Sequence, residues 1–229
     1  MSTLIFIGTT APLDSSTESA IDKQPINGPL HCGLEGLAGD QQQDQRHHGG
    51  LERALHYYPR EHYAYWDEFW QAMELPPAAT PLVAGAFGEN LSDTGLNEEQ
   101  INIGDIFTLG EAVLQVSQPR SPCFKLNIRF GYPQMSLIMQ TSGRTGWLFR
   151  VLQQGLVDPD DSLTLHELSS SNLSVHTCLD ILYNRPFCRE DLELLAEHKT
   201  LSTGWKRHAA NRLESGQPEH WSRRLFNRQ

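Results

Sequence analysis

The fold of this chain depends on residues 117–129, SQPRSPCFKLNIR, where an apolar segment runs directly into a cysteine surrounded by cations. The alternation in residues 113–116, VLQV, predicts a β-strand, and the two prolines that follow predict its end. The segment from Phe124 to Arg129 has helical character. The sequence therefore predicts a strand-to-helix turn that carries Cys123.

The chemistry of this turn depends on the state of the Cys123 thiol. A thiol acts as a nucleophile or a metal ligand only as the thiolate, which nearby cations and helix N-termini favour. Arg120, Lys125 and Arg129 are close in sequence, and backbone N–H groups at such a turn form a site for an anion. A buried cysteine beside surface cations fits the same residues. The local sequence does not separate these two interpretations.

Composition narrows the class of protein. The 229 residues carry a formal net charge of −10 and have a pI near 5.4, which argues against a nucleic-acid or anionic-membrane partner, since those require broad basic surfaces. No stretch approaches the ~20 apolar residues of a membrane span. Residues 1–8 lack a basic segment and a long apolar run, so we expect a cytoplasmic protein. The four cysteines form no Cys-x-x-Cys pair, which favours reduced thiols.

Short apolar segments separated by turns dominate residues 1–168 and predict a mainly β domain of barrel or sandwich type. We expect strands at 4–7, 113–116, 147–152 and 162–168, and an inserted helix at 134–140. Aromatic and apolar residues recur at three- and four-residue steps over 51–73. This spacing predicts an amphipathic helix, which Pro59 can begin, with its aromatic stripe packed in the core.

The composition changes after Leu168, and residues 169–229 predict a small C-terminal unit of three helices. The helices are expected at 174–183, 189–198 and 203–214. Such a unit is too small to hold a large core alone and should dock on the β domain or on a partner.

A second candidate site is the glycine-rich stretch of residues 33–50, which ends in Arg46, His47, His48, Gly49 and Gly50. Glycines let the backbone approach a ligand closely, and the two histidines and the arginine supply hydrogen-bond donors. We expect a ligand-facing loop here. Turn-forming glycines and solvated histidines are the alternative.

Several motifs occur together in an order that resembles the MOSC domain, named after the C-terminal domain of molybdenum cofactor sulfurases. The closer resemblance is to its bacterial stand-alone, YiiM-like branch, and it covers nearly the whole chain, including the C-terminal helices. The motifs are GD at 39–40, RHHGG at 46–50, FGENL at 87–91, IGD at 103–105, QPRSPCFKL at 118–126 and RTGW at 144–147. Each motif alone is weak, but their order and spacing around one cysteine form a specific signal.

The resemblance implies a β-barrel-like fold that carries molybdenum cofactor, a pterin dithiolene with a terminal phosphate. It also implies reduction of N-hydroxylated compounds, such as N-hydroxylated purine base analogues and amidoxime-like substrates, which detoxifies them. Cys123 matches the family's molybdenum ligand. The cofactor-binding residues expected on this basis are Arg46, Gly49, Asn90, Arg120, Lys125, Asn127 and Arg144. Turn capping is an equal alternative for the two asparagines.

We expect His47 or His48 to deliver protons, because histidine titrates near neutral pH. The chain shows no flavin, haem or iron–sulfur signature, so electrons would come from a separate reductase of the flavoprotein type. The C-terminal helices could dock that reductase, cap the domain or form a homodimer contact.

Two other classes of function stay open. One is a carrier that holds the cofactor and passes it on without chemistry of its own. The other is a hydrolase or transferase with Cys123 as nucleophile and His47 or His48 as base. A zinc site fits less well, because the spacing of its ligands, His31, Cys32, His47 and His48, matches no standard zinc pattern.

Overall fold

The structure, a computed structural model, describes residues 2–43, 49–185 and 187–227. Within these ranges the largest sheet has eight strands in the order β13-β9-β10-β11-β7-β8-β1-β4, and its neighbours are antiparallel except for the parallel pair β7 and β8. Its strands are β1 (Leu4–Ile7), β4 (Gln24–Pro25), β7 (Leu55–Pro59), β8 (Leu91–Asp93), β9 (Ile106–Leu109), β10 (Ala112–Pro119), β11 (Trp147–Gln153) and β13 (Thr164–Glu167). The smaller sheets are formed by β5 (Leu30–Gly33), β6 (Gly36–Leu37) and β12 (Gly155–Val157), and by β2 (Ala11–Pro12) and β3 (Glu18–Ser19). The strand-rich fold class predicted from the sequence is confirmed.

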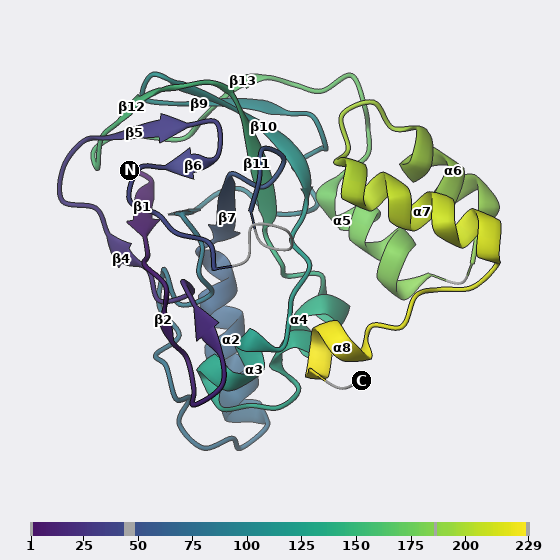
Figure 1. The fold of residues 1–229 in the computed structure, drawn as a ribbon, viewed down its shortest axis with the longest axis horizontal. Helices are drawn as coiled ribbons and strands as arrows, with labels where there is room; N and C mark the ends of the chain where they lie inside the picture. The colour runs from purple at the N-terminus through teal and green to yellow at the C-terminus, as the bar shows by residue number, and fades with distance from the viewer. Residues whose placement is uncertain (1, 44–48, 186, 228–229) are drawn as a thin grey trace.

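The helices lie below the sheet and at one side of it (Figure 1). They are α2 (Glu61–Ala72), α3 (Lys125–Phe130), α4 (Met135–Ser142), α5 (Val175–Leu179), the π-helix η1 (Asp180–Asn184), α6 (Arg189–Glu197), α7 (Thr203–Ser215) and α8 (Ser222–Phe226). The strand-to-helix turn at Cys123 is confirmed, because β10 ends at Pro119 and α3 begins at Lys125. The inserted helix and the three C-terminal helices also form close to their predicted positions. Helix α8 was not predicted.

The predicted helix over residues 51–73 is wrong in its first part. Residues Leu55–Pro59 form β7, a fully buried strand between β11 and β8. Helix α2 begins only at Glu61, so Pro59 ends a strand and does not begin a helix. A short strand covered on both faces lacks the polar and apolar alternation of a half-exposed strand, so the spacing of its side chains alone cannot distinguish it from a buried helix segment.

Two apolar clusters hold the fold together. One joins the sheet to the C-terminal helices and includes Phe149 and Trp147 from β11 together with Val175 and Trp205. This contact confirms that the helical unit docks on the strand-rich domain. The division at residue 168 remains a prediction.

The second cluster is aromatic and lies where α2 meets α3 and α4. Tyr58 and Phe87 have ring centroids 4.6 Å apart, and Phe87 and Phe130 lie 4.8 Å apart. Trp66 of α2 is fully buried among them. The aromatic stripe predicted from the sequence is therefore core packing. None of the helices in the described residues is long and apolar enough to cross a membrane.

Candidate functional site

A cavity of about 180 Å³ opens beside the loop between β10 and α3. Its wall combines residues distant in sequence: Lys23, Asp40, Gln42, Gln43, Arg53, His56, Asn90, Gln118, Arg120, Cys123 and Lys125. The described lining residues include four cationic side chains and one carboxylate, that of Asp40. The four cationic residues are Lys23, Arg53, Arg120 and Lys125. A net-positive cavity in a chain of net charge −10 is suited to an anionic ligand.

Cys123 is half-buried on this loop. The loop follows a register shift between Val116 and Gln118 in the pairing of β10 with β11. Bulges of this kind re-aim a strand end and are common beside active sites. The Cys123 carbonyl accepts a hydrogen bond from the N–H of Leu126 at 3.0 Å, which joins the loop to the first turn of α3. The turn thus places the thiol at the edge of the cavity.

Arg120 supplies the most informative polar group of the cavity. Its Nη1 atom is buried and has no hydrogen-bond partner among the described residues. Burial lowers the pKa of Arg120, whereas negative charge on Cys123 or Glu89 acts in the opposite direction. Buried donors are normally hydrogen-bonded, so an orphaned guanidinium nitrogen in a cavity wall indicates a place for a ligand acceptor.

Lys125 lines the cavity from the start of α3. Its Nζ donates to the carbonyl of Glu18 at 2.9 Å and to Oε1 of Gln43 at 3.0 Å. An ammonium group has three N–H donors, so these two bonds fix the group and leave one donor for a ligand. Lys125 is thus held in a set position in the wall.

A network that the sequence did not reveal also lines the cavity. The Lys23 ammonium pairs with Oδ1 of Asp40, and the exposed fractions of these side chains are only 6% and 1%. Asp40 also accepts from the N–H of Gly8 at 2.8 Å and from Nδ2 of Asn90 at 2.8 Å. Burial lowers the pKa of Lys23, and Asp40 partly offsets that effect. Lys23 stands alone in a polar stretch, so only its burial identifies it.

His56 also lines the cavity and was hidden in the sequence by the helix predicted for residues 51–73. Its Nε2 lies 3.3 Å from the Thr145 carbonyl. Burial, with the charges of Arg120 and Lys23, lowers the pKa of His56 well below its ordinary value. The imidazole is therefore neutral near pH 7.

The predicted residues Asn90, Gly49, Arg46, His47 and His48 have different outcomes. Asn90 lines the cavity, but its side-chain amide is already engaged by Phe6, Asp40 and His56. Gly49 is buried behind the wall, and a Cβ there would lie 2.6 Å from Oε1 of Gln42, so its small size shapes the loop. Arg46, His47 and His48 lie outside the described residues.

Three predicted cations or donors do not line the cavity. Asn127 faces α8 and donates to the Leu225 carbonyl at 2.7 Å. This contact agrees with a structural role for Asn127 and not with cofactor binding. Arg144 stacks over Tyr65, with its guanidinium carbon 3.8 Å from the ring centroid. Arg129 pairs with Asp22 at 2.9 Å. Each of these side chains contacts a partner that is distant in the sequence and does not line the cavity. The local sequence does not show these partners.

Comparison with known proteins shows the family of this chain. Residues 44–164 match the MOSC domain, and residues 173–216 match the YiiM-like, 3-alpha helix domain. The chain therefore belongs to the MOSC domain family, with a C-terminal helical unit of the YiiM-like type.

Among its relatives, the chain is 41% identical over 222 residues to Protein YiiM of Escherichia coli, covering 97% of this chain and 96% of that protein. It is 40% identical over 186 residues to a protein named Reductase from Gibberella moniliformis, covering 81% of this chain but 32% of that protein. The crystal structure of YiiM from Escherichia coli matches with a TM-score of 0.80 at 38% identity, covering 98% of this chain and 97% of that chain.

Proposed function

We propose that this protein is a molybdenum-cofactor-dependent oxidoreductase that reduces small N-hydroxylated compounds, such as N-hydroxylated purine base analogues and amidoxime-like substrates, to amines. The observation that carries the proposal is the net-positive cavity in which Cys123 lies beside the orphaned Nη1 of Arg120. The relative named Reductase supports the class of reaction.

The donor set fits an anionic cofactor with a soft metal. Cys123 would supply the thiolate ligand to molybdenum, because thiolates suit soft metals. Arg120 and Lys125 would hold the phosphate and pterin, since a guanidinium fork matches phosphate geometry and an ammonium adds a point charge. Arg46 remains a proposed cofactor contact, and His47 and His48 remain proposed proton donors.

When bound, the cofactor supplies two-electron chemistry, by which an N–OH group takes up two electrons and two protons and leaves as an amine and water. A separate reductase of the flavoprotein type supplies the electrons in this proposal. The chain itself must deliver protons. Among the residues that the structure describes, we propose Lys23 as a proton donor. Its buried ammonium lies in the cavity wall, and burial lowers its pKa. His56 is less suited to this role, because burial and the charges of Arg120 and Lys23 lower its pKa.

The test compares molybdenum content and pterin fluorescence after oxidation in protein from a cofactor-competent host. The parent is expected to hold stoichiometric metal and pterin, and Cys123→Ala to lose the metal. Cys188→Ala is the matched control, because Cys188 is also half-buried but lies beside α6, away from the cavity. The loaded parent should convert an N-hydroxylated purine to its amine with a chemical reductant.

Absence of both metal and pterin in the parent would overturn the proposal and favour the cysteine nucleophile. Cofactor without turnover, whichever reductant is used, would indicate a carrier. Equal metal in the Cys123→Ala variant would remove the thiol from the metal site.

A further inference from the structure

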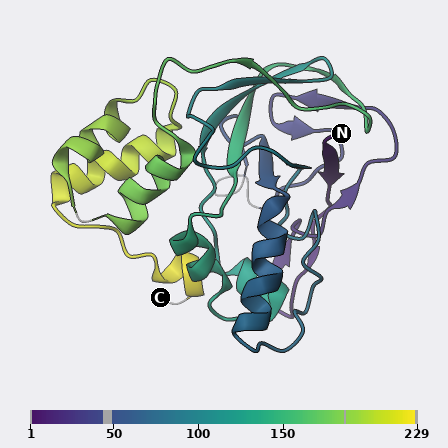
Figure 2. The same cartoon turned by 180° about the vertical axis from the view of Figure 1, so that it is seen from behind.

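The chain beyond α7 returns to the loop that carries Cys123. Residues 217–221 leave the helical unit, and α8 then lies beside α4 (Figure 1). The reverse view shows the same arrangement, with α8 between the helical unit and the helices below the sheet (Figure 2). We call residues 217–227 the C-terminal strap. This segment lies outside the matched three-helix domain, which ends at residue 216.

Arg224 of the strap contacts the residues on both sides of Cys123. Its guanidinium Nη1 donates to the carbonyl of Pro122, and its own carbonyl accepts from the N–H of Phe124 at 2.8 Å. Its Nη2 donates to Oε1 of Gln140 on α4. One residue of the strap thus holds the peptide before the cysteine, the peptide after it and a neighbouring helix.

The next residue fixes the strap to the helices beneath the cavity. The carbonyl of Leu225 accepts from Nδ2 of Asn127 at 2.7 Å and from Oγ of Ser136 at 2.8 Å. The Leu225 side chain is buried. Helix α8 therefore reaches α3 and α4 through both backbone and side-chain contacts, although it is only five residues long.

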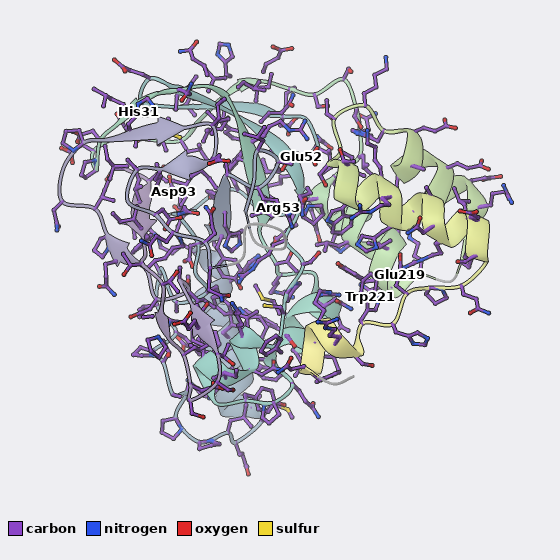
Figure 3. All side chains as sticks on the ribbon, viewed as in Figure 1. His31, Glu52, Arg53, Asp93, Glu219 and Trp221 are labelled. Atoms are coloured by element: carbon purple, nitrogen blue, oxygen red, sulfur yellow. The ribbon has the colours of Figure 1, made fainter. Side chains whose placement is uncertain are left out.

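The strap is also anchored where it leaves the helical unit. Glu219 accepts from Nη2 of Arg212 at 2.7 Å and from Nδ1 of His208 at 3.0 Å. Glu219 and Trp221 lie side by side between α7 and α8 (Figure 3). Trp221 stacks edge-on against Tyr183, with ring centroids 5.5 Å apart. The strap is thus fixed at both ends.

The helical unit makes a second contact with the same loop. The hydroxyl of Tyr183 lies 2.8 Å from Oγ of Ser121, two residues before Cys123. The C-terminal region therefore contacts this loop at Ser121 as well as on both sides of Cys123.

We propose that Arg224 is a positioning residue for Cys123, through which the C-terminal strap confines the thiol in the wall of the cavity. The consequence for molybdenum binding rests on the proposed function, whereas the consequence for the thiol does not. Groups that orient a metal ligand without touching the metal change affinity or activity by about 10- to 100-fold when they are removed.

The test uses the full chain in a Cys188→Ser background, so that the other half-buried thiol does not react. The alkylation rate of Cys123 by iodoacetamide is measured in the cofactor-free protein by peptide mass spectrometry. Arg224→Ala should react several-fold faster, because the Pro122 carbonyl beside Cys123 loses its guanidinium donor. Arg223→Ala is the matched control, since Arg223 is an exposed arginine on the same helix, and it should react like the parent. Arg224→Lys should lie between them, because an ammonium can bond the Pro122 carbonyl but lacks the guanidinium fork.

A second readout is molybdenum content in protein from a cofactor-competent host, which should fall about tenfold in Arg224→Ala and not in Arg223→Ala. Thermal unfolding checks that each variant is folded. Arg185→Ala breaks the exposed pairs with Asp180 and Asp191 and serves as a variant weakened elsewhere in the helical unit.

Equal alkylation of the Arg224→Ala and Arg223→Ala variants would overturn the inference, as would equal acceleration by Arg185→Ala. A parent without molybdenum would overturn the proposed function while the alkylation test still decided the role of Arg224. A loaded parent with no Arg224 effect would overturn the positioning role alone.

Discussion

The cavity wall and the C-terminal helical unit use charged side chains in opposite ways. In the wall, Lys23 and Asp40 pair with side chains that are 6% and 1% exposed. In the helical unit, Arg189 and Glu193 pair one helical turn apart with side chains that are 69% and 46% exposed. The second pair has the i,i+4 spacing of a helix, whereas Lys23 and Asp40 are 17 residues apart, and only this first pair is removed from water.

The contribution of an ion pair to stability depends on how far its charges are removed from water. An exposed pair gains little, because water and salt screen it. A buried pair must offset the loss of hydration of both ions, and removing one partner leaves a charge that nothing compensates. The cavity adds a guanidinium nitrogen of Arg120 that has no described partner. Such a group destabilises the fold, and its place in the wall of a net-positive cavity is what suits it to a ligand.

The largest expected effect comes from breaking the buried pair. Asp40→Ala should lower the free energy of unfolding by about 3–5 kcal/mol, because Lys23 is left buried without its partner. Arg189→Ala, which breaks the exposed pair, should cost less than about 0.5 kcal/mol. Urea unfolding at pH 7 measures both. The double variant Lys23→Met, Asp40→Asn should recover part of the loss. Equal effects of the two single alanine variants would remove the contrast between the regions.

A change in the opposite direction is expected at Arg120. Arg120→Met removes the buried, unpartnered Nη1, so the free energy of unfolding of the cofactor-free protein should rise by about 1–2 kcal/mol. The same variant should lose molybdenum, because the proposed anion contact is gone. Urea unfolding and elemental analysis on one preparation test both halves. A variant that is less stable than the parent would show that this guanidinium supports the fold.

A smaller effect than at Asp40 or Arg120 is expected at Glu219, which is partly exposed. Burial raises its pKa, but hydrogen bonds from His208 and Arg212 outweigh this and bring the pKa from 4.5 to about 2. Its contribution is therefore present above pH 4.5 and is lost as the pH falls toward 2. Glu219→Gln should cost about 1 kcal/mol at pH 7, an amount reduced by solvent screening. Unfolding curves of parent and variant should converge as the pH is lowered, and a constant difference would contradict this account.

Local pattern was enough for the turn that carries Cys123. The alternation of residues 113–116, the two prolines and the cations after them lie within one short stretch, and the structure forms β10 and α3 there. The same local logic failed for residues 55–59, where pairing on both edges makes a strand of a segment with helical spacing. Strand pairing is a long-range property that the spacing of side chains does not contain.

The cavity could be predicted only in part. Arg120, Cys123 and Lys125 are neighbours in sequence, and the structure keeps them together. Lys23 and His56 joined them only through the packing of distant strands, and no motif marked either residue. Asn127 and Arg144 looked equally suited to a ligand, but α8 and Tyr65 engage them instead.

By itself the sequence determined the strand-rich class, the C-terminal helices and the family, because periodicity, turn residues and ordered motifs are local properties of the chain. The tertiary structure alone decided which charges are buried, which buried donors are left without a described partner and which segment contacts the loop of Cys123. The strap shows this most clearly, since Arg224 lies 102 positions from Pro122 in the sequence yet donates a hydrogen bond to the Pro122 carbonyl. Burial and contact depend on the path of the whole chain, and that path is set only when distant segments pack together.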